Sequence, residues 1–74
     1  MMYWIIHYTD TLLNGKVLGW DVVREETTNL IALFTKKEVA EKEADNLSRE
    51  FRKTEVIPLE LTYLDKNYYI IVDK

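Results

Sequence analysis

His7 is the only histidine in this chain of 74 residues, and the chain contains no cysteine. A structural zinc site usually needs about four histidine or cysteine ligands, and a catalytic zinc site usually needs about three protein ligands. Carboxylates alone can hold calcium, but no stretch has the spaced Asp and Asn ligands around a glycine that an EF-hand loop requires. The sequence therefore predicts no metal site and no bound cofactor.

The sequence also offers few residues for nucleophilic or acid-base catalysis. Ser48 is the only serine, it lies in a charged segment with helical spacing, and no histidine stands near it in sequence to act as a base. Paired carboxylates such as Asp21 with Glu25 or Glu26 would need a cleft that keeps one of them protonated. A run such as REE is more typical of a solvated loop. The sequence therefore predicts that the protein is not an enzyme.

Binding to phosphate is weakly supported. Phosphate-binding loops need several glycines so that backbone amides can converge, and the chain has only Gly15 and Gly19. The formal net charge of −3 works against non-specific attraction to nucleic acids and to anionic lipid surfaces. Lys36 and Lys37 nevertheless stand at the start of a predicted helix, where they oppose the helix dipole by about 0.3 kcal/mol. They are the candidate basic contact of a nucleic-acid-binding accessory domain, which could also stack bases on sheet aromatics.

Length and composition indicate one small globular domain spanning residues 1–74. Hydrophobic residues make up 47% of the chain, which is too many for a disordered segment. The longest apolar runs, LIALF and YYIIV, are far shorter than the roughly 20 residues of a membrane-spanning helix. Because a small secreted domain usually needs disulfides, the lack of cysteine favours a cytoplasmic location.

The clearest predicted element is a helix over residues 35–53. Apolar residues recur along it at helical spacing and form one narrow stripe, which consists of Ala40, Ala44, Leu47 and Phe51. Thr35 and Glu38 fit a capping box at its start. The spacing therefore predicts an amphipathic helix with one buried face.

The segment after the helix predicts a second hairpin. Residues 56–64 alternate between apolar and polar side chains, as in a half-buried strand, and Pro58 places this strand at a sheet edge because it lacks an amide donor. A two-residue loop at Lys66 and Asn67 would bring residues 68–72 back beside it. Ile70 and Val72 would then share a face with Leu61 and Tyr63.

The first hairpin turns at Asn14-Gly15, and its register has two alternatives. A loop of these two residues would give two mixed faces. Leu18 and Trp20 would share a face with His7, and Asp21 and Val23 would share a face with Ile6. A loop that also includes Lys16 would separate apolar from polar side chains, so we favour it. One face would then carry Trp4, Ile6, Tyr8, Leu18, Trp20 and Val22, and the other Ile5, His7, Thr9, Val17, Asp21 and Val23.

LIALF, residues 30–34, is apolar at every position, which favours a strand covered on both faces. The element order is therefore strand, strand, strand, helix, strand, strand. This order predicts the α+β class: a small antiparallel sheet with one amphipathic helix packed on one face.

One helix covers one sheet face, so the outer face should expose apolar side chains and bind a partner. The candidate interface on this outer face comprises Ile5, His7, Val17, Asp21, Val23, Tyr69 and Ile71. We therefore predict a small protein-interaction module that forms a homodimer or docks on a partner protein. On this surface His7 would be a pH-sensitive contact, because Asp21 as a diagonal neighbour favours the charged imidazolium.

Two alternative functions remain open at this level. One is the nucleic-acid-binding domain that uses Lys36, Lys37 or sheet aromatics. The other is a small acidic inhibitor, of the kind that phages and mobile elements encode, which occupies a basic site on a larger protein. Small size and negative charge are compatible with such an inhibitor, but they are compatible with many other functions as well.

Overall fold

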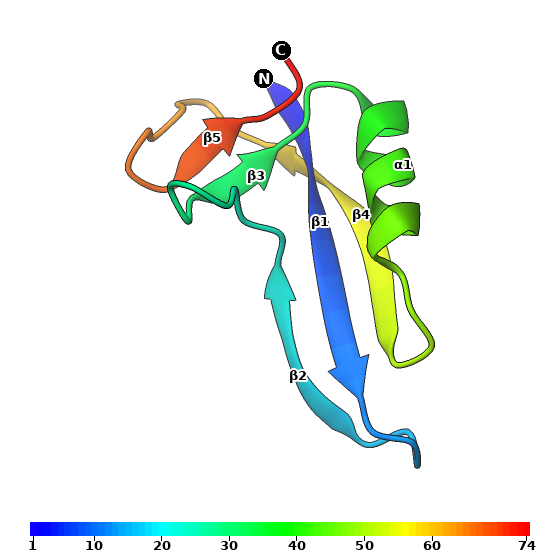
Figure 1. Cartoon of the computed structure of the whole chain (residues 1–74). Coiled ribbons are helices and arrows are strands. Elements are labelled where there is room, and N and C mark those ends of the chain that lie inside the picture. The colour runs from blue at the N-terminus through cyan, green and yellow to red at the C-terminus, as the bar shows by residue number, and fades with distance from the viewer.

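The computed structural model describes all 74 residues and confirms the predicted α+β class and element order. The strands and the helix follow one another as β1 (Met2–Thr11), β2 (Val17–Val22), β3 (Ile31–Leu33), α1 (Lys37–Leu47), β4 (Arg52–Glu60) and β5 (Tyr69–Ile71) (Figure 1). The helix lies against one side of the long strands, while β3 and β5 lie together near the chain termini.

The long strands form an antiparallel sheet in the order β2-β1-β4, with β1 in the centre. The position of β4 at the end of this order confirms the edge strand that Pro58 predicts. Pro58 pairs with Trp4 of β1. An edge strand tolerates proline because only one of its two sides must supply ladder hydrogen bonds.

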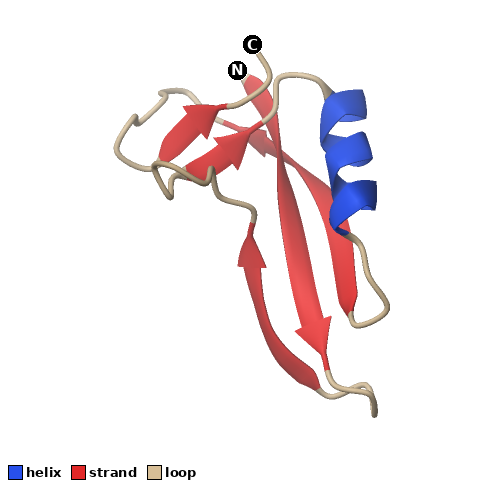
Figure 2. Cartoon of the chain, in the orientation of Figure 1, coloured by secondary structure: helices blue, strands red, loops and turns tan.

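The predicted hairpin between β4 and β5 is wrong. The strand β4 ends at Glu60, and β5 pairs in parallel with β3 instead (Figure 2). The turn before β5 is closed by Asp65, whose carbonyl accepts hydrogen bonds from the Tyr68 and Tyr69 amides and whose carboxylate accepts one from the Asn67 amide. The Tyr68 bond encloses Lys66 and Asn67, so the predicted turn is present. The hairpin is absent because β4 ends at Glu60 and residues 61–64 form no strand beside β5.

The strand β3 connects the two sheets. The backbones of Trp4 and Phe34 exchange two hydrogen bonds of 2.9 Å, and the Ala32 amide donates to the Val23 carbonyl. The last three residues of LIALF are covered on both faces as predicted, since Ala32, Leu33 and Phe34 are all buried, while Leu30 and Ile31 are half-buried. A short strand with both faces covered therefore joins the β3–β5 pair to β1.

The helix is shorter than predicted. It ends at Leu47, because Ser48 takes an extended conformation while its amide still donates to the Ala44 carbonyl. Phe51, which we placed on the helical stripe, lies after the helix and is 41% exposed. Ala40 and Ala44 are the helix residues that are buried, and small side chains there let the helix lie close to the sheet.

The predicted capping box at Thr35 is also wrong. Lys36 is the N-cap residue, and it makes no side-chain capping bond. Asp73, near the other end of the chain, holds the start of the helix instead: its carboxylate accepts hydrogen bonds from the Thr35 amide at 2.7 Å and from the amide of the N-cap residue Lys36 at 3.0 Å. A carboxylate at this position also complements the positive end of the helix dipole.

The core lies between the helix and the upper half of the sheet. It comprises Ile6, Ala32, Phe34, Ala40 and Ala44, with Trp4, Val23 and Val56 packed against it. Thr54 of β4 donates a hydrogen bond from its hydroxyl to the Ala44 carbonyl. The five core residues, together with Tyr3 and Leu33, are the only 7 of 74 residues that are buried, so the buried interior is small even for a short chain.

The register predicted for the first hairpin is wrong, although its loop has an odd length. The Leu12 amide donates to the Lys16 carbonyl, and the loop closed by this hydrogen bond consists of Leu13, Asn14 and Gly15. The register then shifts by one residue, because Asp10 pairs with Gly19 while Thr11 pairs with Val17, which leaves Leu18 as a bulge. His7 therefore lies opposite Val22, and Thr9 lies opposite Trp20.

This shift exchanges the two faces of β2. Asp21 lies opposite Tyr8, on the side of the sheet that carries the helix, and Val23 packs against the core. Trp20 and Val22 lie on the outer face with His7. The rule that separates polar from apolar faces fails here because much of β2 lies beyond the helix, where no core selects a register.

Asp73→Ala should lower the free energy of unfolding by about 1 kcal/mol near pH 7, because it removes the carboxylate that accepts hydrogen bonds from the Thr35 and Lys36 amides. Burial raises the pKa of the Asp73 carboxyl, but the hydrogen bonds from Thr35 and Lys36 outweigh this effect and hold the pKa below its usual value. The stabilisation is therefore complete above the unfolded-state pKa of about 3.8 and is lost as the pH falls through the lower folded-state pKa.

Urea unfolding followed by circular dichroism measures this effect near pH 7 and near pH 3. Glu43→Ala is the control, because it removes an exposed carboxylate from the same helix. An equal loss in both variants, or a loss for Asp73→Ala that grows at low pH, would contradict this role of Asp73.

Candidate functional site

The end of the β1–β2 hairpin projects beyond the helix and the core (Figure 1). The molecule is elongated as a result, with extents of 40 × 24 × 22 Å. Apolar side chains gather on this projection and are between 43% and 86% exposed. We call these five residues the arm: Leu12, Leu13, Val17, Leu18 and Trp20.

The outer face of the arm is centred on Trp20, which is 69% exposed. Its indole lies beside the imidazole of His7, with ring centroids 5.2 Å apart and planes inclined by 37°. The other neighbours of His7 across the sheet are Val22 and Glu55. His7 therefore lies on the outer face as expected, but its acidic neighbour there is Glu55 and not Asp21.

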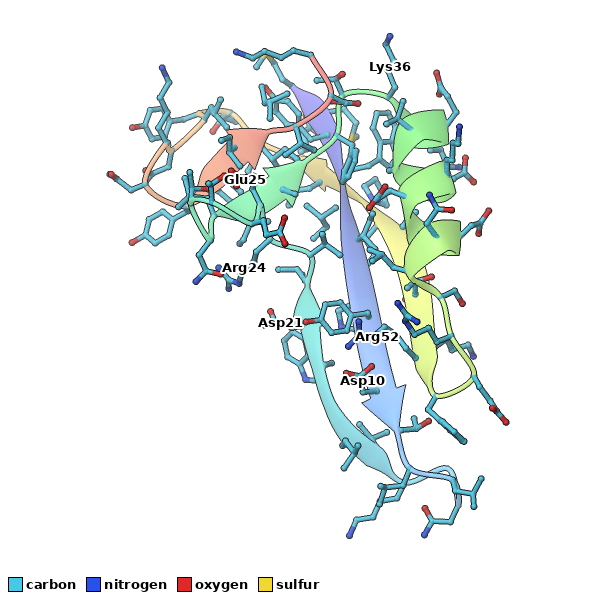
Figure 3. The ribbon with its side chains drawn as sticks, in the orientation of Figure 1. Asp10, Asp21, Arg24, Glu25, Lys36 and Arg52 are labelled. Atoms are coloured by element: carbon cyan, nitrogen blue, oxygen red, sulfur yellow. The ribbon has the colours of Figure 1, made fainter.

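The helix side of the hairpin carries an ion pair that fixes β4 against β1. The Arg52 guanidinium donates to both oxygens of Asp10, at 2.6 Å and 3.0 Å, and lies 4.5 Å from the centre of the Tyr8 ring (Figure 3). The hydrogen bond from Arg52 holds the pKa of Asp10 below its usual value. This pair positions the base of the arm.

A cleft of about 350 Å³ lies next to this ion pair, below the end of the helix. Its lining includes Tyr8, Asp21, Arg24 and Arg52. Each arginine has a carboxylate partner, because Arg24 lies 3.9 Å from Asp21 and Arg52 binds Asp10. The charges of the cleft are thus balanced within the protein, which leaves no free charge to select a ligand.

The candidate interface residues do not form one surface. Ile5 and His7 lie on the outer face of β1, and Val17 lies on the arm. Asp21 and Val23 lie on the helix side. Tyr69 and Ile71 lie in β5, which belongs to the other sheet. The surface that the structure exposes most strongly is therefore different from the predicted one.

Leu12, Leu13, Leu18 and Trp20 were missed as candidate surface residues. A signal for them was present in TLLNGKVLGW, where a turn of the Asn-Gly type is flanked by leucines. Turns at a loop tip are usually polar, so leucines beside such a turn indicate apolar side chains in solvent.

Lys36 and Lys37 are exposed at the start of the helix, as expected. The Asp73 carboxylate accepts amide hydrogen bonds at the same helix end. It therefore offsets the unfavourable interaction of the two lysines with the helix dipole, on which their prediction as a basic contact rests.

The free edge of β2 is protected against strand addition. The bulge at Leu18 interrupts the regular ladder, and the Asp21 carboxylate accepts a hydrogen bond of 2.7 Å from the Val22 amide. Both devices are typical of edge strands that do not pair with another chain. A partner of the arm is therefore expected to contact its side chains.

No protein family, curated protein or solved structure matches this chain. No helix in the structure has the length and apolar character needed to cross a membrane. No group of three or more His, Asp or Glu side chains is placed to hold a metal ion.

Trp20→Ala should change the free energy of unfolding by less than about 0.5 kcal/mol, because Trp20 contributes little to the core. Ile6→Val removes one methyl group from a fully buried side chain and should cost about 1 kcal/mol. Urea unfolding of both variants, in dilute samples, measures the difference. A larger loss for Trp20→Ala than for Ile6→Val would show that Trp20 is a structural residue of the monomer.

Proposed function

We propose that the protein is a non-enzymatic protein-interaction module that forms a homodimer through the outer face of the arm. The observation that carries this proposal is the exposure of Leu12, Leu13, Val17 and Trp20 on one projecting hairpin. Leu18 is exposed on the helix side of the same hairpin, where it lines a cavity with Phe51 and Arg52. Soluble monomers rarely expose contiguous apolar groups of this kind without a partner. A cytoplasmic setting fits the lack of cysteine.

The small core favours a second copy as the partner. A chain of this length that lacks disulfides has little buried area to stabilise its fold, and oligomerisation is one of the usual remedies. Only seven side chains are buried here. Association of two arms would bury their apolar side chains and so increase the buried apolar area of each protomer.

Because the edge of β2 is protected against strand addition, we expect the two protomers to meet through side chains on their sheet faces. We do not expect β2 of one protomer to pair with β2 of the other. In a dimer with two-fold symmetry, the same patch of each protomer meets its counterpart. Trp20 is then the expected anchor of the interface, because tryptophan is among the residues that contribute most binding energy at interfaces. The polar outer residues Thr9 and Glu55 would lie toward its rim.

The solution mass should rise from that of a monomer to that of a dimer as the protein concentration increases, because dimerisation follows mass action. Trp20→Asp should remain monomeric over the same range, since it places a charge at the centre of the interface. Light scattering coupled to size-exclusion chromatography measures both.

The matched control is Tyr63→Asp, which places the same charge at an aromatic residue that is 73% exposed and lies outside the arm. This variant should dimerise as the wild type does. A wild-type protein that stays monomeric at all concentrations would overturn the proposal, as would a dimer that survives Trp20→Asp but not Tyr63→Asp.

A further inference from the structure

The strand β5 has a free edge. It pairs only with β3, in a sheet of two strands. The Ile31 amide donates to the Tyr68 carbonyl, and the Val72 amide donates to the Leu33 carbonyl, so the backbones of Tyr68 and Val72 face β3. Because successive residues of a strand alternate, the amide and carbonyl of Ile71 point toward the open edge.

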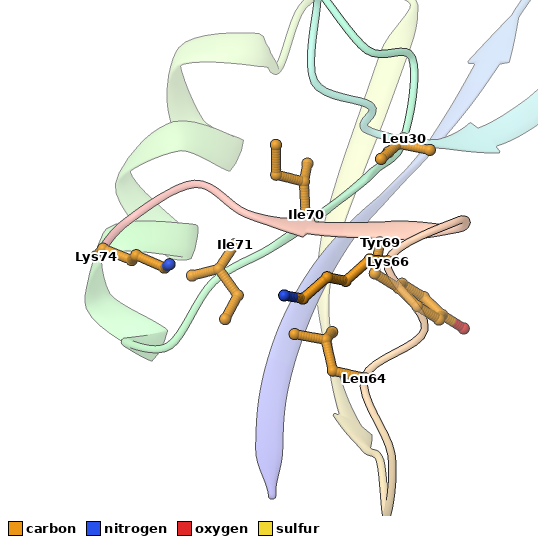
Figure 4. Close-up of a pocket in the computed structure, with 7 residues that line it drawn as sticks. All are labelled: Leu30, Leu64, Lys66, Tyr69, Ile70, Ile71 and Lys74. Carbon is orange, nitrogen blue, oxygen red and sulfur yellow. The ribbon is translucent and has the colours of Figure 1, made fainter.

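A cavity of about 270 Å³ lies along this strand (Figure 4). Its lining includes three consecutive residues, Tyr69, Ile70 and Ile71. Side chains of consecutive strand residues point to opposite faces, so a cavity that touches all three lies at the strand edge. Leu30 and Leu64 complete an apolar wall.

Two lysines stand at the mouth of this cavity, Lys66 and Lys74. Their ammonium groups point toward one another over Ile71 (Figure 4). The two salt bridges of the structure involve Arg24 and Arg52, so neither lysine has a carboxylate partner within bonding distance. The cavity thus joins an apolar wall, free backbone groups and unpaired positive charge.

We propose that this site binds the C-terminal segment of a partner polypeptide. The segment adds as an extended strand beside β5 and hydrogen-bonds to the backbone of Ile71. An apolar side chain at its end enters the cavity, and its terminal carboxylate lies between Lys66 and Lys74. Strand addition and capture of a chain terminus are both established modes of peptide recognition.

The free backbone groups favour a peptide over a free fatty carboxylate. A fatty carboxylate would use the apolar wall and the lysines, but it would leave the edge of β5 without hydrogen-bond partners. A peptide satisfies all three features of the site. The site lies on β5, away from the projecting end of the β1–β2 hairpin (Figure 1), so the proposal does not depend on the arm.

The test is a nuclear magnetic resonance titration of the isotope-labelled protein with the peptide acetyl-Ala-Val-Thr-Leu. One form of the peptide has a free terminal carboxylate, and the other has a terminal amide. The acid form should bind about tenfold more tightly, because it gains charge-assisted hydrogen bonds. The largest shifts should involve the backbone amide of Ile71 and its neighbours in β5.

The double variant Lys66→Ala with Lys74→Ala should reduce binding of the acid form to that of the amide form. Its control removes the same charge elsewhere, through Lys16→Ala with Lys42→Ala, and should bind as the wild type does. Equal affinities for the two peptides, equal losses in the two double variants, or shifts that centre on the arm would overturn the proposal. Octanoate that binds as tightly as the acid peptide would also overturn it, in favour of a fatty carboxylate.

Discussion

The length of the single helix limits how much of the sheet can be covered. A helix of 11 residues is about 16 Å long, whereas a strand of 10 residues such as β1 extends for about 33 Å. Near its end the helix contacts Thr54, whose hydroxyl donates to the Ala44 carbonyl, and Thr54 lies opposite Tyr8. The parts of β1 and β2 beyond Tyr8 therefore have no helix over them. The buried residues are therefore confined to one end of the sheet, and the arm remains exposed.

Contacts between distant parts of the chain hold the covered half together. Asp73 of the C-terminal segment holds the start of the helix, and β3 joins the β3–β5 pair to β1 through Trp4 and Phe34. The Asp10–Arg52 pair fixes β4 against β1 where the helix no longer reaches. These interactions order the backbone up to the base of the arm, so that the exposed side chains project from a defined position.

The sequence predicted those features that depend on local patterns. The helical stripe located Ala40 and Ala44, Pro58 located an edge strand, and the apolar run at LIALF located a strand covered on both faces. The features that it failed to predict depend on distant partners. The bulge at Leu18 reversed the register, the start of the helix is held by Asp73 and not by Thr35, and β5 found its partner in β3 and not in β4.

The candidate surface was predicted only in part for the same reason. A search for apolar residues on the outer face depends on the register, so the shift at Leu18 moved Asp21 and Val23 to the other side and brought Trp20 to the outer face. The arm itself could have been found from composition, because leucines flank the Asn14-Gly15 turn. Exposure at a loop tip does not depend on register.

The central claim is that the arm meets the arm of a second copy. Its most direct test is an isotope-filtered nuclear Overhauser experiment on a mixture of labelled and unlabelled protein, which detects only contacts between protomers. The account predicts intermolecular signals from the Trp20 indole to methyl groups of the arm, such as those of Val17. Intermolecular signals that arise only from other surfaces, or no such signals at millimolar concentration, would contradict it.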